Sequence, residues 1–89
     1  MRVIGQSRNW FTSELGNELM MMNIDRGVYI GLNPMGVQIW RLIEPPQTIG
    51  DICAALIEKF EVDPAVCRAE VEAFVEKMAA RGLITVADI

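Results

Sequence analysis

The chain has 89 residues, of which 52% are hydrophobic, and its 8 Lys+Arg against 12 Asp+Glu give a formal net charge of −4. It contains no histidine, which excludes imidazole-based acid–base catalysis and every metal site that needs a histidine ligand. The acidic balance argues against a general nucleic-acid binder, because phosphate contacts need clustered Lys and Arg. The length suits one domain over residues 1–89, in which we expect neither a cofactor nor a metal ion.

Two cysteines, Cys53 and Cys67, form neither a CxxC motif nor a zinc-binding pattern. We interpret both as reduced thiols in the core of a cytoplasmic protein, because free cysteines are usually buried. Residues 1–10 contain no apolar run long enough for a signal peptide. No stretch approaches the roughly 18 to 20 apolar residues of a membrane span. We therefore expect a soluble protein with no membrane contact.

The first third of the chain is typical of short strands joined by tight turns. Residues 9–15, 18–24 and 28–32 are rich in aromatic, aliphatic and methionine side chains. The turns between them contain Gly16 and Gly27, and short turns between neighbouring strands indicate antiparallel hairpins. The pattern predicts a three-stranded meander whose last strand has no further partner, apart from a short strand at the C-terminal end of the chain.

The remaining two thirds are typical of helices. The predicted helices occupy residues 34–43, 48–60 and 63–81, and the short strand follows at 83–86. Asn33 and Asp63 are predicted N-caps, each followed by a proline at the first helical position. Thr48, three residues before an acidic side chain, resembles a capping box, and Gly82 is placed to end the last helix.

The element order predicts an α+β fold, with a three-stranded antiparallel β meander followed by a three-helix unit. Three helices joined by tight turns and followed by a β element resemble a winged helix-turn-helix. We treat strands 9–32 and helices 34–82 as parts of one domain, since no linker-like segment separates them.

A winged helix-turn-helix suggests DNA binding, but the charges argue against it. Residues 33–89 carry five basic and nine acidic side chains, whereas residues 1–32 carry three of each. The entire net charge of −4 therefore lies on the helical part, and such a surface repels phosphate.

Two groups in the third helix are weak candidates for catalysis. Glu72 and Glu76 are four residues apart and can share one helix face, but no histidine or further acidic cluster supports them. Cys67 lies near a helix N-terminus, which lowers a thiol pKa, but it has no base partner. We interpret the carboxylates as a solvated helix face and the thiol as a packing group, and we expect no enzyme activity.

Met20, Met21 and Met22 make both faces of the second strand apolar, because successive side chains of a strand alternate. In one interpretation, one face of this strand packs on the helices, and a further element or a second chain covers the other face. The alternative is a soft and adaptable binding face.

The third strand, residues 28–32, is apolar on both faces and lies at the end of the meander. It contains no Lys or Pro that would block pairing, so its edge is an aggregation hazard unless something covers it. One solution is an extended peptide that adds as a further strand, with the third helix as the other wall of a groove. Cover by the chain's own terminus, or by a homodimer, is the alternative.

Several motifs taken together resemble the PqqD-like proteins. They are the run Gly27-Val28-Tyr29-Ile30-Gly31-Leu32-Asn33, then Gly36, Ile39-Trp40 and Leu42, the second-helix pattern Thr48-Ile49 to Ile52 with Ala54-Ala55-Leu56, the start Val62-Asp63-Pro64, and the ending Arg81-Gly82-Leu83-Ile84. The resemblance covers about residues 9–86. Each motif alone is a weak signal for this family. Their order and spacing together make the resemblance specific.

The resemblance implies a recognition element for ribosomally made, post-translationally modified peptides. In such proteins the leader of the precursor peptide binds as an extra strand beside the third strand, against the third helix, and is presented to modifying enzymes. The peptide-binding residues that the resemblance implies are Val28, Tyr29, Ile30, Gly31 and Leu32 on the strand, and Cys67, Glu70, Val71 and Phe74 on the helix. Trp40, Val75 and Met78 are assigned to the core instead.

The resemblance also implies the partners, which are the leader peptide and a leader peptidase or another modifying enzyme of the same gene cluster. The chain resembles the free-standing type, because it has no fused catalytic domain. The aliphatic strand favours lasso-peptide biosynthesis, and the alternatives are a chaperone of pyrroloquinoline quinone biosynthesis or a winged-helix regulator that binds DNA. A homodimer through the edge strand stays open as well.

Overall fold

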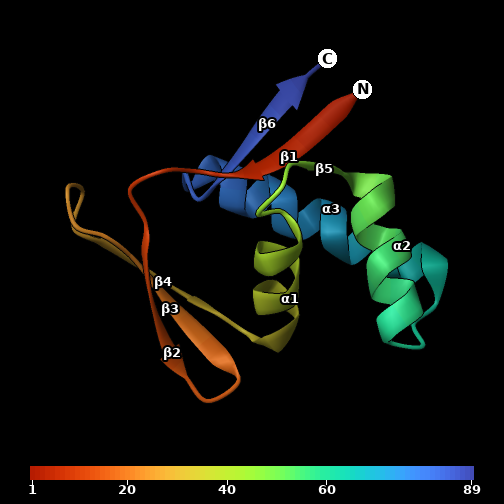
Figure 1. Cartoon of the computed structure of the whole chain (residues 1–89), viewed down its shortest axis with the longest axis horizontal. Helices are drawn as coiled ribbons and strands as arrows, with labels where there is room; N and C mark the ends of the chain where they lie inside the picture. Colours follow the sequence, from red (N-terminus) through yellow and green to blue (C-terminus); the bar gives the residue numbers. More distant parts are fainter.

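The computed structural model describes all 89 residues and contains three helices and two antiparallel sheets (Figure 1). The elements in chain order are β1 (Arg2–Gln6), β2 (Phe11–Leu15), β3 (Glu18–Asn23), β4 (Val28–Leu32), α1 (Pro34–Leu42), β5 (Gln47–Thr48), α2 (Ile49–Lys59), α3 (Pro64–Ala80) and β6 (Ile84–Asp88). The expected α+β class, the antiparallel strand pairing and the three helices are confirmed.

One sheet contains β2, β3 and β4 in that order, so β3 is its central strand. The β3–β4 turn is tight because Gly27 adopts φ +65, a conformation that costs glycine little. The Asn23 side chain also accepts a 3.1 Å hydrogen bond from the Arg26 backbone N–H. In this register Met21 lies opposite Ile30, and both side chains point into the core.

The predicted caps begin each helix. Asn33 accepts a hydrogen bond from Gly36 N–H at 2.8 Å, Thr48 from Asp51 N–H at 3.1 Å, and Asp63 from Val66 N–H at 3.1 Å. These bonds satisfy amides that have no partner within the first helical turn. Gly82 ends α3 with φ +80, as expected of a C′ glycine. None of the three helices is long and apolar enough to cross a membrane.

The second sheet was not expected. Residues 2–6 form a strand, and β1 is the centre of a sheet with the order β5-β1-β6. The C-terminal strand therefore pairs with β1, from Arg2↔Asp88 to Gln6↔Ile84, and not with the meander. As a result both chain ends lie side by side at one end of the molecule (Figure 1). The sequence analysis predicted only one sheet, the meander. That prediction was wrong for residues 2–6 and for the C-terminal strand, which together form a second sheet.

Smaller corrections concern element ends. Asn9 adopts φ +68 and Trp10 precedes β2, so this strand is shorter than the expected 9–15. The Trp10 indole N–H instead donates a 3.1 Å hydrogen bond to the Gly82 carbonyl. This bond attaches the start of the β2–β3–β4 sheet to the end of α3.

The core lies between the two sheets and the helices. The expected core residues Trp40, Val75 and Met78 are all buried, with at most 8% of each residue exposed. Their burial joins α1 and α3 to the sheets in a single hydrophobic cluster, which also contains Ile4 of the unexpected strand β1.

Gly36 controls how closely α1 approaches α3. A Cβ at this position would lie 3.0 Å from the Phe74 ring, 3.3 Å from the Asn33 side-chain oxygen and 3.4 Å from the Leu32 Cβ.

We predict that Gly36→Ala lowers the free energy of unfolding by about 1 kcal/mol, because overpacking exceeds the gain in helix propensity. The matched control is Gly50→Ala, where the nearest atom would be 3.8 Å away. Urea unfolding that showed equal stabilisation by both substitutions would contradict this account.

Candidate functional site

The free edge of β4 is the first component of the candidate site. β4 pairs only with β3, so no strand of this chain hydrogen-bonds to its other edge. Ile30 and Leu32 point into the core, whereas Tyr29 and Gly31 are exposed and Val28 is half-buried. A fully apolar strand with one unpaired edge is the arrangement that the sequence predicts for residues 28–32.

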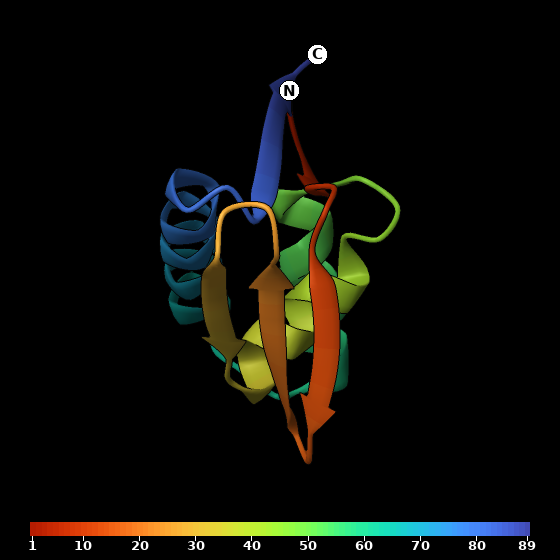
Figure 2. The ribbon, with the colours of Figure 1, turned by 90° about the vertical axis from the view of Figure 1, so that its left-hand side faces the viewer.

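Helix α3 lies beside this edge. In Figure 2, α3 runs along the side of β4 that faces away from β3, and its C-terminal end lies near the β3–β4 turn. Two contacts fix this placement. The Phe74 ring packs near Gly36 just after β4, and the Arg26 guanidinium lies over Gly82 at the other end. We call the strip between the free edge of β4 and α3 the β4–α3 face.

The four α3 residues expected at the site differ in burial. Glu70 is exposed and Phe74 is half-buried, so both are accessible along the flank of α3. Cys67 and Val71 are buried, with 4% and 1% exposed, and belong to the hydrophobic core. The structure therefore leaves Glu70 and Phe74 accessible on α3, with Phe74 near Leu32 at the end of β4, while Cys67 and Val71 lie in the core.

A mainly apolar cavity of about 190 Å³ lies at the N-terminal end of α3. Its lining includes Cys67, Glu70 and Val71 of the expected set, together with Met35 from α1 and Leu56 from α2. The full lining is Met35, Ile39, Leu56, Val62, Asp63, Val66, Cys67, Glu70 and Val71. The cavity is large enough for one apolar side chain.

The sequence analysis missed Met35 and Val66 as candidate site residues. Val66, in the first turn of α3, is 53% exposed. An aliphatic residue one position before the predicted helix stripe is the only signal that would have indicated it. Met35 gave no such signal, because its role depends on how α1 and α3 meet.

The outer face of the β2–β3–β4 sheet is also apolar. Phe11, Met22 and Tyr29 lie in neighbouring positions across the three strands. Phe11 and Tyr29 are 57% and 67% exposed, whereas Met20 and Met22 are half-buried. No element of the chain packs over this face in Figure 2, so the interpretation in which a further element covers one methionine face is wrong within this chain.

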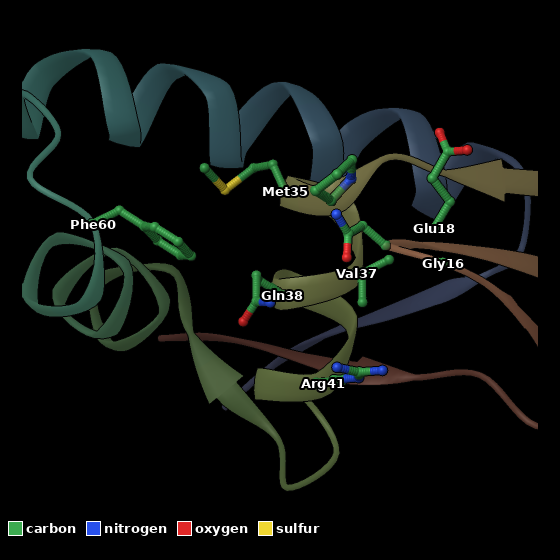
Figure 3. A pocket seen from close by; sticks show the side chains of 9 residues that line it. Gly16, Glu18, Met35, Val37, Gln38, Arg41 and Phe60 are labelled. Carbon is green, nitrogen blue, oxygen red and sulfur yellow. The ribbon is translucent and has the colours of Figure 1, made fainter.

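Two other clefts are less apolar. Figure 3 shows one of about 280 Å³ on the other side of Met35, where Gln38, Arg41 and Phe60 surround the opening. Arg41 is already paired with Glu14 at 2.7 Å. A wider cleft of about 680 Å³ lies between the β1–β6 ends and the opposite flank of α3. Neither is lined by Cys67, Glu70, Val71 or Phe74, the α3 residues expected at the site.

Comparison with known proteins agrees with this geometry. Residues 18–84 match the family described as Coenzyme PQQ synthesis protein D (PqqD). The chain belongs to the PqqD family. The matched range begins at β3 and ends at the first residue of β6, so it contains β4, all three helices and every residue that we expected at the site.

Two solved structures share the fold of this PqqD-family chain. One is described as "TbiB1 in Complex with the TbiA(beta) Leader Peptide", with a TM-score of 0.80, 22% identity and coverage of 90% of this chain and 93% of that one. The other is "Lasso peptide synthetase B1 complexed with the leader peptide", with a TM-score of 0.80, 15% identity and coverage of 92% and 96%. No curated protein matches the chain.

Both cysteines of this PqqD-family protein are free and buried, as expected. Burial raises the pKa of the Cys53 thiol above its ordinary value, and the neighbouring Cys67 raises it further. A raised pKa and burial both make a thiol a poor nucleophile. No three His, Cys, Asp or Glu side chains cluster closely enough to hold a metal ion.

We predict that Cys53 and Cys67 of the folded protein react with a thiol reagent at pH 8 at least about tenfold more slowly than in denaturant, because only local or global opening exposes them. Mass spectrometry of alkylated protein after timed quenching measures both sites. Rapid labelling of Cys53 in the native protein would contradict its burial.

Proposed function

We propose that the protein binds the leader region of a ribosomally made precursor peptide as an additional strand on β4, and presents it to modifying or processing enzymes in lasso-peptide biosynthesis. The observation that carries this proposal is the free edge of β4 with α3 beside it. The proposed binding residues are Val28, Tyr29, Ile30, Gly31 and Leu32 on β4, with Cys67, Glu70, Val71 and Phe74 on or beneath the flank of α3.

The energetics of an unpaired edge support this mode of binding. Alternate N–H and C=O groups of β4 point away from β3, and an added strand hydrogen-bonds to them. Each such bond contributes about 0.5 to 1.5 kcal/mol net. The apolar cavity beside Glu70 adds burial of one peptide side chain, worth about 25 cal/mol per Å² of apolar surface.

The comparisons support the same proposal. The family is named for coenzyme PQQ synthesis. Both similar structures are complexes with a leader peptide, and one of them is described as a lasso peptide synthetase B1 protein. These likenesses favour lasso-peptide biosynthesis, and pyrroloquinoline quinone biosynthesis is the alternative pathway. A catalytic role has no support in either case, so the modifying or processing enzyme is a separate partner.

We also propose that residues 1–89 form a single domain, in which the meander β2–β3–β4 precedes a three-helix unit of winged helix-turn-helix type. Similar helix order in DNA-binding proteins makes a regulator the rival function. The charge distribution disfavours that rival, because α3 together with its N-cap and C-cap carries four acidic side chains against three basic ones. Retarded migration of promoter DNA with strong salt dependence would favour it instead.

Backbone methylation of the peptide tests strand addition without altering the protein. The probe is the leader of the precursor peptide that is encoded beside this protein, methylated at one backbone nitrogen at a time. We predict that affinity alternates along the central residues. Methylation at every second position weakens binding by about tenfold or more, because it removes a donor to β4, and the intervening positions tolerate it.

The unmethylated peptide and a scrambled sequence of the same composition are the controls, and isothermal titration calorimetry is the measurement. Uniform tolerance of methylation along the peptide would contradict strand addition. Light scattering of the protein with and without the leader separates this mode from a homodimer that pairs two β4 edges. Such a dimer would dissociate when the leader binds.

A further inference from the structure

The exposed side chains along α3 change sign from one end of the β4–α3 face to the other. Glu70, Phe74, Lys77 and Arg81 follow one another at spacings of three and four residues, so they form one stripe on the helix. Phe74, one turn after Glu70, lies near Leu32 at the C-terminal end of β4, and Gly82, next to Arg81, lies under the Arg26 guanidinium of the β3–β4 turn.

The acidic end contains two carboxylates beside the apolar cavity. Asp63 and Glu70 both line that cavity, and both residues are exposed. Asp63 also caps α3 through a hydrogen bond from Val66 N–H, whereas Glu70 has no salt bridge. An apolar peptide residue that enters the cavity is therefore next to uncompensated negative charge.

The basic end combines two elements. Lys77 and Arg81 come from the last turn of α3 and its cap, and Arg26 comes from the β3–β4 turn, where its guanidinium lies over Gly82. None of these three cations forms a salt bridge. Two acidic residues are neighbours in sequence: Asp25 in the same turn, and Glu76, which lines the cleft on the opposite flank of α3. Positive charge therefore predominates at this end.

The helix dipole explains only part of this arrangement. Acidic groups at the first turn and basic groups at the last turn stabilise a helix, which accounts for Asp63, Lys77 and Arg81. Glu70 lies beyond the first turn, and Arg26 belongs to a different element. On the opposite flank of α3, Arg68 and Glu72 pair with each other at 2.8 Å, and Glu76 forms no salt bridge.

We infer that the β4–α3 face selects a peptide by the order of its charges, with basic groups at the Glu70 end and acidic groups at the Arg26–Arg81 end. This inference rests on the proposed function. Every ladder in the protein is antiparallel, and antiparallel addition to β4 places the peptide's N-terminal part at the Glu70 end. The bound segment is thus basic first and acidic afterwards.

The helix geometry sets the spacing between the two charges. Glu70 and Arg81 are separated by about 16 Å along the helix axis at about 1.5 Å per residue. An extended peptide covers that length in about five residues. The matching ligand carries Lys or Arg about five residues before Asp or Glu, with an apolar residue close to the basic one to enter the cavity.

Selection from a random library of peptides about ten residues long, displayed on phage, tests this inference without a known ligand. The baits are the wild-type chain, the charge-swapped variant Glu70→Lys with Arg81→Glu, and a matched control, Arg68→Glu with Glu72→Arg. The control swaps the same number of charges on the opposite flank of α3 and restores its own ion pair. Circular dichroism confirms that all three baits are folded.

We expect wild type and control to enrich peptides with basic residues before acidic ones, and the swapped variant to enrich the reverse order. Two synthetic peptides with the two orders should differ at least about fivefold in affinity at low salt, and the difference should shrink as salt is added. Enrichment without any charge order, or an order that the swap leaves unchanged, overturns the inference while the proposed function stands. If wild type enriches no peptide that perturbs β4, the proposed function fails as well.

Discussion

The unpaired edge of β4 is the constraint on which the remaining features of the protein depend. Its outward N–H and C=O groups lose their hydrogen bonds to water whenever anything apolar approaches, so only another backbone is a good neighbour. A side chain alone satisfies one group at a time, whereas a peptide satisfies several in register. This restriction is what makes the edge selective for an extended chain over a folded surface.

The second sheet keeps that edge open. The C-terminal strand β6 is the obvious internal candidate to cover β4, but five residue pairs hold it against β1. The β1–β6 ladder lies at the opposite end of the molecule from the β2–β3 turn (Figure 1). The C-terminal strand is thus paired with β1 and leaves the edge of β4 without a partner from this chain.

Helix α3 serves two purposes, because one face packs in the core and one flank borders β4. Val71, Val75 and Met78 hold it in the core, and the Phe74 ring packs close to Gly36 of α1. Rigid placement lowers the entropic cost of binding, since only the peptide must become ordered. The charged stripe on the flank adds selectivity without contributing to the core.

Local chemistry explains which parts of the fold were predictable. The caps at Asn33, Thr48 and Asp63 and the positive φ of Gly27 follow from a few neighbouring residues, and all were predicted. The strand at residues 2–6 was not, because it is short, contains a glycine, and pairs with residues about 80 positions later. Nothing in its own sequence reveals that partner.

The candidate site divides in the same way. The β4 edge was predictable, because an apolar strand at the end of a meander has no local partner. The cavity was not, because Met35, Leu56 and Val66 come from three different helices that meet only in the folded protein. The burial of Cys67 and Val71 also depends on how α2 and α3 pack together, and helical spacing alone does not decide between core and flank.

Backbone amide signals during a titration with the neighbouring precursor's leader test the central claim most directly. At leader concentrations up to about 100 μM, above the dissociation constant expected of a small interface, the account predicts shifts for residues 28–32 and the Glu70–Arg81 flank of α3. Signals of β1 and β6 serve as the internal reference and should stay in place. Shifts confined to β1, β6 and the opposite flank of α3, or no shifts at all, would contradict it.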